Sequence, residues 1–248
     1  MEMMPYVDDE IIKDQIKNNK TKWFSGFSNP TLLLMYLTTK FDIATMYGCN
    51  AGAFGYKNLH ESFKNALKIL KGDIVVQQSF DKCEIISFDE ESEEGLILNT
   101  DAKWITPNGE VDIEGRLIGG CIDTLVFFHG TRFDYIKEFV ERYKDDGIIW
   151  YFDNFGLSVE DLYSELWTLR ESGWFKYAKG FVFGRTMFES SRTGATYEEG
   201  IKRALGDEIP IILDTETSHI KPRFCLINGA IGHFKSQNGK GSLEMKLK

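Results

Sequence analysis

The sequence predicts an α/β protein with a mostly parallel sheet, and three observations lead to this prediction. Short apolar runs typical of buried strands alternate along the chain with segments whose apolar residues recur at helical spacing. Hydrophobic residues make up 42% of the chain and aromatic residues 14%, which is enough for a substantial core. No internal repeat or low-complexity tract interrupts the alternation. Helices between apolar strands require crossover connections, and such connections join parallel strands.

The first part of the chain is expected to form two short strands and two helices. The strands are predicted at residues 23–27 and 42–47, and the helices at residues 31–39 and 58–71. The second helix carries an apolar stripe and is followed by Gly72, a typical helix stop.

The middle of the chain has a different composition. Residues 89–94 (DEESEE) form a charge run, and residues 107–109 (PNG) form a tight turn. Because charge runs are usually solvated, we expect a linker at residues 76–100. This linker would separate an N-terminal unit, residues 1–75, from a C-terminal unit, residues 101–248.

The C-terminal unit shows the most regular alternation. Its strands are predicted at residues 123–128, 147–152, 179–183 and 209–213, and its helices at residues 134–144, 158–172 and 197–205. Ser158, with Asp161 three residues later, is expected to cap the second of these helices.

Charge and cysteine content narrow the class of protein. The chain carries 29 basic and 38 acidic side chains, a net charge of −9, which argues against a nucleic-acid or anionic-membrane partner. No apolar run is long enough for a transmembrane helix, and the first ten residues lack a signal-peptide pattern. Four widely spaced cysteines are expected to be free thiols, so a cytoplasmic location is predicted. They are Cys49, Cys83, Cys121 and Cys225.

Two titratable residues follow predicted strands at the edge where ligands bind in open α/β sheets. Asp153 comes directly after the strand at 147–152, and His219 ends the polar segment that follows the strand at 209–213. A carboxylate and an imidazole could act as orienter and general base in acyl transfer. From spacing alone, the common alternatives stay open: an Asp that forms a turn, and a His in a solvated loop.

The remaining histidines suggest no metal or cofactor site. His60 is expected on a helix surface, His129 at a strand end and His233 in a C-terminal turn. None pairs with another His or Cys at ligand spacing, and no phosphate-binding glycine motif is present, so no metal and no cofactor are predicted.

A nucleophile is harder to identify. Residues 26–30 (GFSNP) imitate a G-x-S-x-G nucleophile elbow around Ser28, except that Pro30 replaces the second glycine. The same residues also suit an ordinary turn that leads into a helix.

Several motifs together, in order, resemble the serine LD-carboxypeptidase family, which includes self-immunity proteins against microcin C-type peptide–nucleotides. These motifs are residues 22–31 (KWFSGFSNPT), 115–121 (GRLIGGC), 130–131 (GT), 147–153 (GIIWYFD), 173–185 (GWFKYAKGFVFGR) and 218–222 (SHIKP). The resemblance implies a partial N-terminal Rossmann-like (flavodoxin-like) domain followed by a C-terminal α/β domain. It also implies a metal-free Ser–Glu–His triad that hydrolyses the amide between an L-centre and a terminal D-amino acid. The substrate would be a small muropeptide-like peptide or a toxic peptide–nucleotide, and a homodimer is left open.

Carried over by position, the resemblance assigns His219 as the base and Asp153 as its orienter, in place of the family's Glu. It matches Ser28 to a structural serine and places the nucleophile upstream of Met1, because residues 3–8 (MMPYVD) resemble the segment that follows it. Ser218 also replaces a glycine before the base, and Gly156 an acidic residue. The 248-residue chain is therefore expected to be inactive alone. It would be either one part of an enzyme or a non-catalytic remnant that keeps a peptide-binding or dimerisation surface.

Overall fold

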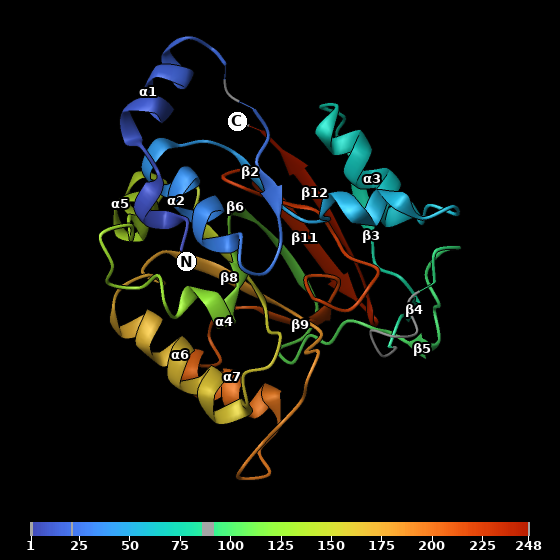
Figure 1. Cartoon of the computed structure of the whole chain (residues 1–248). Coiled ribbons are helices and arrows are strands. Elements are labelled where there is room, and N and C mark those ends of the chain that lie inside the picture. The colour runs from blue at the N-terminus through green and yellow to red at the C-terminus, as the bar shows by residue number, and fades with distance from the viewer. Residues whose placement is uncertain (1, 21, 86–91, 248) are drawn as a thin grey trace.

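The central sheet of the protein contains seven strands (Figure 1). The computed structural model describes residues 2–20, 22–85 and 92–247. The seven strands are β3 (Val76–Gln78), β6 (Val111–Cys121), β7 (Ile148–Asp153), β8 (Ala178–Gly184), β9 (Ile211–Thr215), β11 (Ile231–Gln237) and β12 (Lys240–Lys246). Their order across the sheet is β3-β12-β11-β6-β7-β8-β9. Strands β6 to β9 are parallel neighbours, and β11, β12 and β3 extend the sheet by antiparallel pairing. The fold is thus mixed α/β with a mostly parallel central sheet, as predicted.

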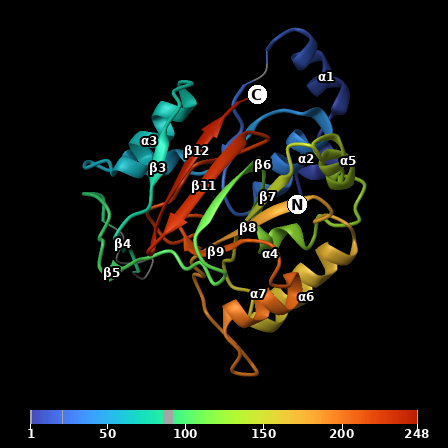
Figure 2. The same ribbon diagram turned by 180° about the vertical axis from the view of Figure 1, so that it is seen from behind.

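Helices cover both faces of this sheet. They are α1 (Asp9–Lys17), α2 (Thr31–Phe41), α3 (Glu61–Leu70), α4 (Ile122–Leu125), α5 (Ile136–Arg142), α6 (Val159–Glu171) and α7 (Tyr197–Leu205), with short 3-10 turns η1 (Met4–Tyr6) and η2 (Ala51–Gly55). Helices α6 and α7 lie side by side on one face, and α3 lies on the other (Figures 1 and 2). None of the helices described is long and apolar enough to cross a membrane.

Strand β7 shows why this sheet is buried on both sides. Trp150 and Phe152 pack into the core beneath α2, α5 and α6, whereas Ile149 and Tyr151 pack into the core beneath α3. All four side chains are fully buried. A strand covered on both faces reads as a continuous apolar run, which is why residues 147–152 are recognisable in the sequence.

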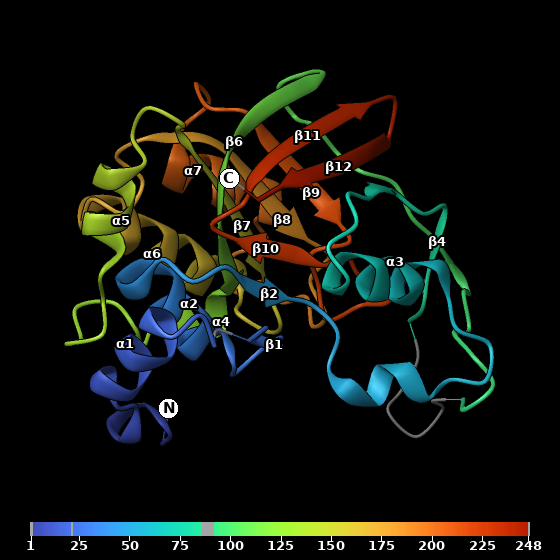
Figure 3. The ribbon, with the colours of Figure 1, turned by 90° about the horizontal axis from the view of Figure 1, so that it is seen from above.

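Two smaller sheets connect distant parts of the chain. Strands β1 (Ser25–Gly26), β2 (Thr45–Tyr47) and β10 (Leu226–Asn228) form one, in which β1 is parallel and β10 antiparallel to β2 (Figure 3). Strands β4 (Lys82–Cys83) and β5 (Thr100–Asp101) form the other. The pairing of β2 with β10 brings an early segment against the chain that follows His219.

Most predicted elements are confirmed within a few residues. The five predicted helices correspond to α2, α3, α5, α6 and α7, and the predicted cap at Ser158 is formed, since its side chain accepts a backbone hydrogen bond. The strands predicted at 147–152, 179–183 and 209–213 correspond to β7, β8 and β9. Those at 23–27 and 42–47 shorten to β1 and β2. The proposed boundaries at 75 and 100 stay a prediction, and residues 89–91 of the charge run lie outside the described residues.

Three predictions are wrong, one of them the strand end at His129, which lies in the turns after α4. Residues 123–128 do not form a strand: they lie in α4 and the turns after it, and the strand is β6, which ends at Cys121. Glycines hid β6 in the sequence, yet Gly119 is required because a Cβ there would lie 1.9 Å from the Tyr151 carbonyl oxygen. His233 lies on β11 opposite Glu114 rather than in a turn, because the hairpin turn comes later, at residues 238–239.

Candidate functional site

Asp153 lies at the carboxyl end of β7, in the centre of the parallel part of the sheet, and is fully buried. Its Oδ1 accepts a hydrogen bond from the backbone N–H of His219 at 3.1 Å and lies 3.0 Å from Nδ1 of the same residue. Its Oδ2 accepts a hydrogen bond from the Tyr47 hydroxyl at 2.6 Å. Both oxygens therefore have donors, which compensate for the burial of the carboxylate.

His219 lies in the loop after β9, and Glu216 holds this loop in place. The Glu216 carboxylate is fully buried and accepts hydrogen bonds from the guanidinium of Arg185 at 2.8 Å and the indole of Trp104 at 2.6 Å. It also accepts one from the backbone N–H of Phe80 at 3.2 Å. The loop is thus tied to the end of β8 and to two earlier segments, which keeps His219 beside β7.

The His219 ring contacts two aromatic rings. The ring of Phe27 lies 5.1 Å away, edge-on, and the ring of Phe155 lies 4.7 Å away. With Nδ1 directed at Asp153, the neutral tautomer that fits this network carries its proton on Nδ1. Nε2 then bears the lone pair, and within the described chain no residue is hydrogen-bonded to it. This is the arrangement of a general base whose partner fixes its tautomer.

Ser28 lies at the turn between β1 and α2 with a φ of 66°, a conformation that is uncommon for a residue other than glycine. Its backbone N–H donates to the Tyr47 hydroxyl at 3.3 Å, and Tyr47 in turn donates to Asp153. The turn is tight, since a Cβ on Gly26 would lie 2.8 Å from the Cβ of Pro30. A serine in a strained strand-to-helix turn is the geometry of a nucleophile elbow.

Tyr47 is the residue that sequence reasoning missed. It lies on the three-residue strand β2, and burial, with Asp153 as a second cause, raises its pKa well above the usual range, so it stays a neutral donor. A tyrosine in a short apolar segment carries no sequence signal of this role, because the partner is 106 residues away.

The other candidate residues have different surroundings. Gly120 is buried in β6 with a φ of 155°, and a Cβ there would lie 2.4 Å from Cγ2 of Thr31 at the start of α2. Cys121 pairs with Asp153 across the β6–β7 ladder, but burial above all raises the pKa of its thiol, which makes it a poor nucleophile. His129 packs against Trp174 instead, and no described contact joins it to His219.

The two remaining histidines serve local structure. The ring of His60 accepts the backbone N–H of Ser62 and caps α3, and burial lowers its pKa. His233 pairs with Asp112 on the neighbouring strand. In the part of the chain that the structure describes, no group of three His, Cys, Asp or Glu residues could hold a metal ion.

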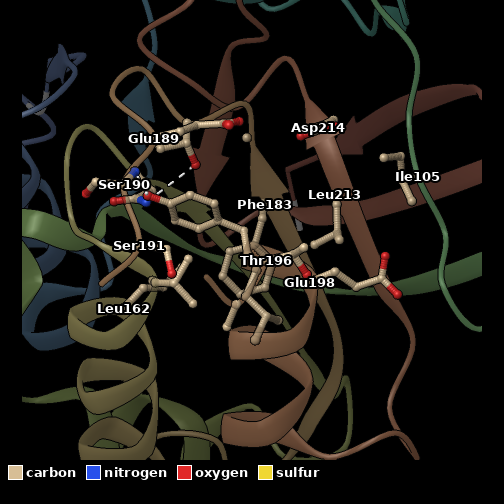
Figure 4. Close-up of a pocket in the computed structure, with 17 residues that line it drawn as sticks. Ile105, Leu162, Phe183, Glu189, Ser190, Ser191, Thr196, Glu198, Leu213 and Asp214 are labelled. Carbon is tan, nitrogen blue, oxygen red and sulfur yellow. Dashed lines mark hydrogen bonds between the residues drawn. The ribbon is translucent and has the colours of Figure 1, made fainter. Parts of the chain in front are cut away.

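A cavity of about 540 Å³ opens beside the site, at the carboxyl ends of β8 and β9 (Figure 4). Its lining includes Asn154, next to Asp153, and Asp214, whose pKa burial raises, but neither Asp153 nor His219 itself. The segment that carries Phe188 and Glu189 connects its wall to the site, because the Phe188 ring packs edge-on against Phe155 at 5.1 Å.

Residues 114–233, which contain both Asp153 and His219, match the model of the LD-carboxypeptidase C-terminal domain. A Vibrio cholerae protein named as a carboxypeptidase is 24% identical over 98% of this chain and 71% of its own length. This part of the chain, residues 114–233, belongs to the LD-carboxypeptidase C-terminal domain family. The resemblance in the sequence motifs is therefore confirmed.

Solved structures of family relatives have the same fold. An MccF-like protein from Streptococcus pneumoniae, solved with AMP, has a TM-score of 0.76 at 22% identity, over 99% of this chain and 75% of its own. A muramoyltetrapeptide carboxypeptidase from Oxalobacter formigenes has a TM-score of 0.65 at 20% identity, and the match covers 92% of this chain and 69% of that protein. MccF is named as the microcin C7 self-immunity protein. The chain thus shares the fold of both kinds of relative.

Proposed function

We propose that the protein is a serine-type LD-carboxypeptidase in which Ser28, His219 and Asp153 form the catalytic triad. The observation that carries this proposal is the Asp153–His219 contact at 3.0 Å, beside which the backbone N–H of Ser28, not its hydroxyl, is joined to the same carboxylate through the Tyr47 hydroxyl. The positive φ of Ser28 is the second support, because such strain at a strand-to-helix turn is a feature of nucleophilic serines.

The chemistry would follow from these positions. The Ser28 hydroxyl attacks the carbonyl carbon of the amide while Nε2 of His219 takes its proton, and Asp153 stabilises the imidazolium. Backbone N–H groups near Ser28 would stabilise the oxyanion of the tetrahedral intermediate. His219 then gives its proton to the departing amine as the C–N bond breaks. Water, deprotonated by the same imidazole, hydrolyses the resulting ester and releases the serine.

We propose an amide between an L-centre and a terminal D-amino acid as the substrate bond, in a muropeptide or a toxic peptide–nucleotide. The names of the two structural relatives support these two classes, one as a muramoyltetrapeptide carboxypeptidase and one as an MccF-like protein with AMP. The cytoplasm is the proposed location, since the four cysteines are buried free thiols.

The upstream nucleophile inferred from the sequence motifs remains the alternative assignment. In that case Ser28 is structural, and His219 and Asp153 act on a hydroxyl supplied from outside the 248 residues. A non-catalytic remnant is the second alternative. The backbone strain at Ser28 supports neither of these two alternatives. A turn with a purely structural role would be more stable with glycine at this position, because glycine adopts a positive φ without strain.

Release of D-alanine from a tetrapeptide by the purified chain tests the proposal. The wild type, Ser28→Ala, His219→Gln and Asp153→Asn are compared, with Ser172→Ala, at the end of α6, as the matched serine control. We expect activity in the wild type and the control only. If Ser28→Ala keeps full activity, the nucleophile lies elsewhere; if the wild type releases nothing, the proposed function fails for this chain.

A further inference from the structure

Arg223 contacts two residues of the proposed site, the ring of Phe27 and the backbone of His219. Its Cζ lies 4.0 Å from the centre of the Phe27 ring, and Phe27 both precedes Ser28 and contacts the His219 ring. One guanidinium nitrogen, Nη2, donates to the backbone carbonyl of His219. The residue as a whole is partly exposed, although its Nε is buried.

Within the described residues, Arg223 has no acidic partner of the kind that the two buried arginines have. Arg116 is paired with Asp146 at 2.6 Å, and Arg185 with Glu216 at 2.8 Å. No acidic side chain among residues 2–20, 22–85 and 92–247 is paired with Arg223, and its Nε is buried without a hydrogen-bond partner. A guanidinium stays charged at any working pH, and a buried donor without a partner is rare in native proteins. This group is therefore suited to an anion that arrives with a ligand.

We propose that Arg223 binds the terminal carboxylate of the substrate. This inference rests on the proposed function and specifies how the enzyme selects the end of a peptide. In a terminal residue only the Cα separates the amide nitrogen from the carboxylate carbon, which places the two about 2.5 Å apart. A carboxylate anchor must therefore lie directly beside the reacting groups, and Arg223 does so through Phe27 and His219. Its planar fork suits a carboxylate better than a lysine would.

The first test compares two tetrapeptides that differ only in their last group, a free carboxylate or a carboxamide. For the wild type we expect kcat/KM to be about 10- to 100-fold higher for the acid, the effect of one charge-assisted hydrogen bond or a pair. In Arg223→Gln the ratio of kcat/KM for the acid to kcat/KM for the amide should fall close to one. Arg223→Lys should retain part of the preference for the acid. The matched control is Arg132→Gln, because Arg132 also stacks on a phenylalanine, Phe133, at 4.8 Å and is exposed. It should leave the preference unchanged.

The comparison separates anchoring from a structural role. If Arg223 only supports the His219 loop, Arg223→Gln lowers kcat/KM equally for both peptides and the preference remains, which overturns the proposal. A wild type without preference for the acid also overturns it.

The second test does not require hydrolysis. N-acetyl-D-alanine and its amide are titrated into Ser28→Ala, with the His219 ring proton shifts followed by NMR. Shifts caused by the acid alone, and lost when Arg223→Gln is added, support the anchor even if the wild type hydrolyses neither peptide. Equal shifts with both compounds, or no shifts, overturn it.

Discussion

Replacing Tyr47 by phenylalanine removes one oxygen atom from the centre of the proposed triad. The hydroxyl donates to the buried Asp153 carboxylate at 2.6 Å and accepts the backbone N–H of Ser28 at 3.3 Å. A hydrogen bond to a charged group contributes about 1.5–3 kcal/mol, so the free energy of unfolding should fall by that amount. For a chain of this size, this loss corresponds to a decrease in Tm of about 3–12 °C. Without this hydroxyl, the Asp153 carboxylate and the Ser28 backbone are held less firmly in position. We therefore expect kcat/KM to fall about 10- to 100-fold.

Tyr151→Phe is the matched control for this change. Tyr151 is also fully buried, its ring centre lies 5.8 Å from that of Tyr47, and its hydroxyl donates to Oδ1 of Asn228 at 2.6 Å rather than to the triad. Its loss should cost about 0.5–1.5 kcal/mol of stability and leave kcat/KM within twofold. Urea denaturation and D-alanine release measure the two quantities. If Tyr47→Phe keeps wild-type activity, or if both variants lose activity equally, the positioning role of Tyr47 is refuted.

Three further changes test the packing and charge around the site. Gly26→Ala should lower Tm and kcat/KM together, because its Cβ would meet Pro30 at 2.8 Å, whereas Gly52→Ala, with nothing within 4 Å of its Cβ, should do neither. Glu216→Gln leaves a buried guanidinium without its counter-charge and should reduce the free energy of unfolding by about 3–5 kcal/mol in urea denaturation; a loss under 1 kcal/mol would contradict the bracing of the His219 loop. Asp214→Asn should stabilise the protein at pH 7, since burial raises the pKa of this carboxyl and its ionisation therefore opposes folding as pH rises. The gain should shrink when denaturation is repeated at pH 4, because the raised pKa lets the native carboxyl take up a proton at a higher pH than an ordinary aspartate, and a gain independent of pH would contradict this cause.

Long periodic segments made much of the fold predictable. Helix α6 and strand β7 follow from local pattern, because an apolar stripe and a capping serine mark the helix and an uninterrupted apolar run marks the strand. Strand β6 was not recognised, because its glycines, which let neighbouring backbones approach closely, weaken the strand pattern. The glycines of β6 are explained by close contacts with other segments of the chain, and such contacts cannot be inferred from the sequence of β6 alone.

Asp153 and His219 could be proposed from the sequence because each follows an apolar strand, and strand ends meet at one edge of a parallel sheet. Ser28 could be identified only as a serine in a turn. Its positive φ is seen only in the folded chain, and its link to Asp153 runs through Tyr47 on β2, a strand that pairs with β10 between residues about 180 positions apart.

The sequence by itself determined the alternation of helices and strands, the resemblance to the family, and two candidate residues, one at the end of β7 and one in the loop after β9, because these depend on patterns within a few residues. The tertiary structure decided which groups meet. It joined Tyr47 to Asp153 across the sheets and placed Arg223 over Phe27. Such contacts arise when distant segments bury their apolar faces against one another. The polar groups that are buried with these faces must then form hydrogen bonds with each other.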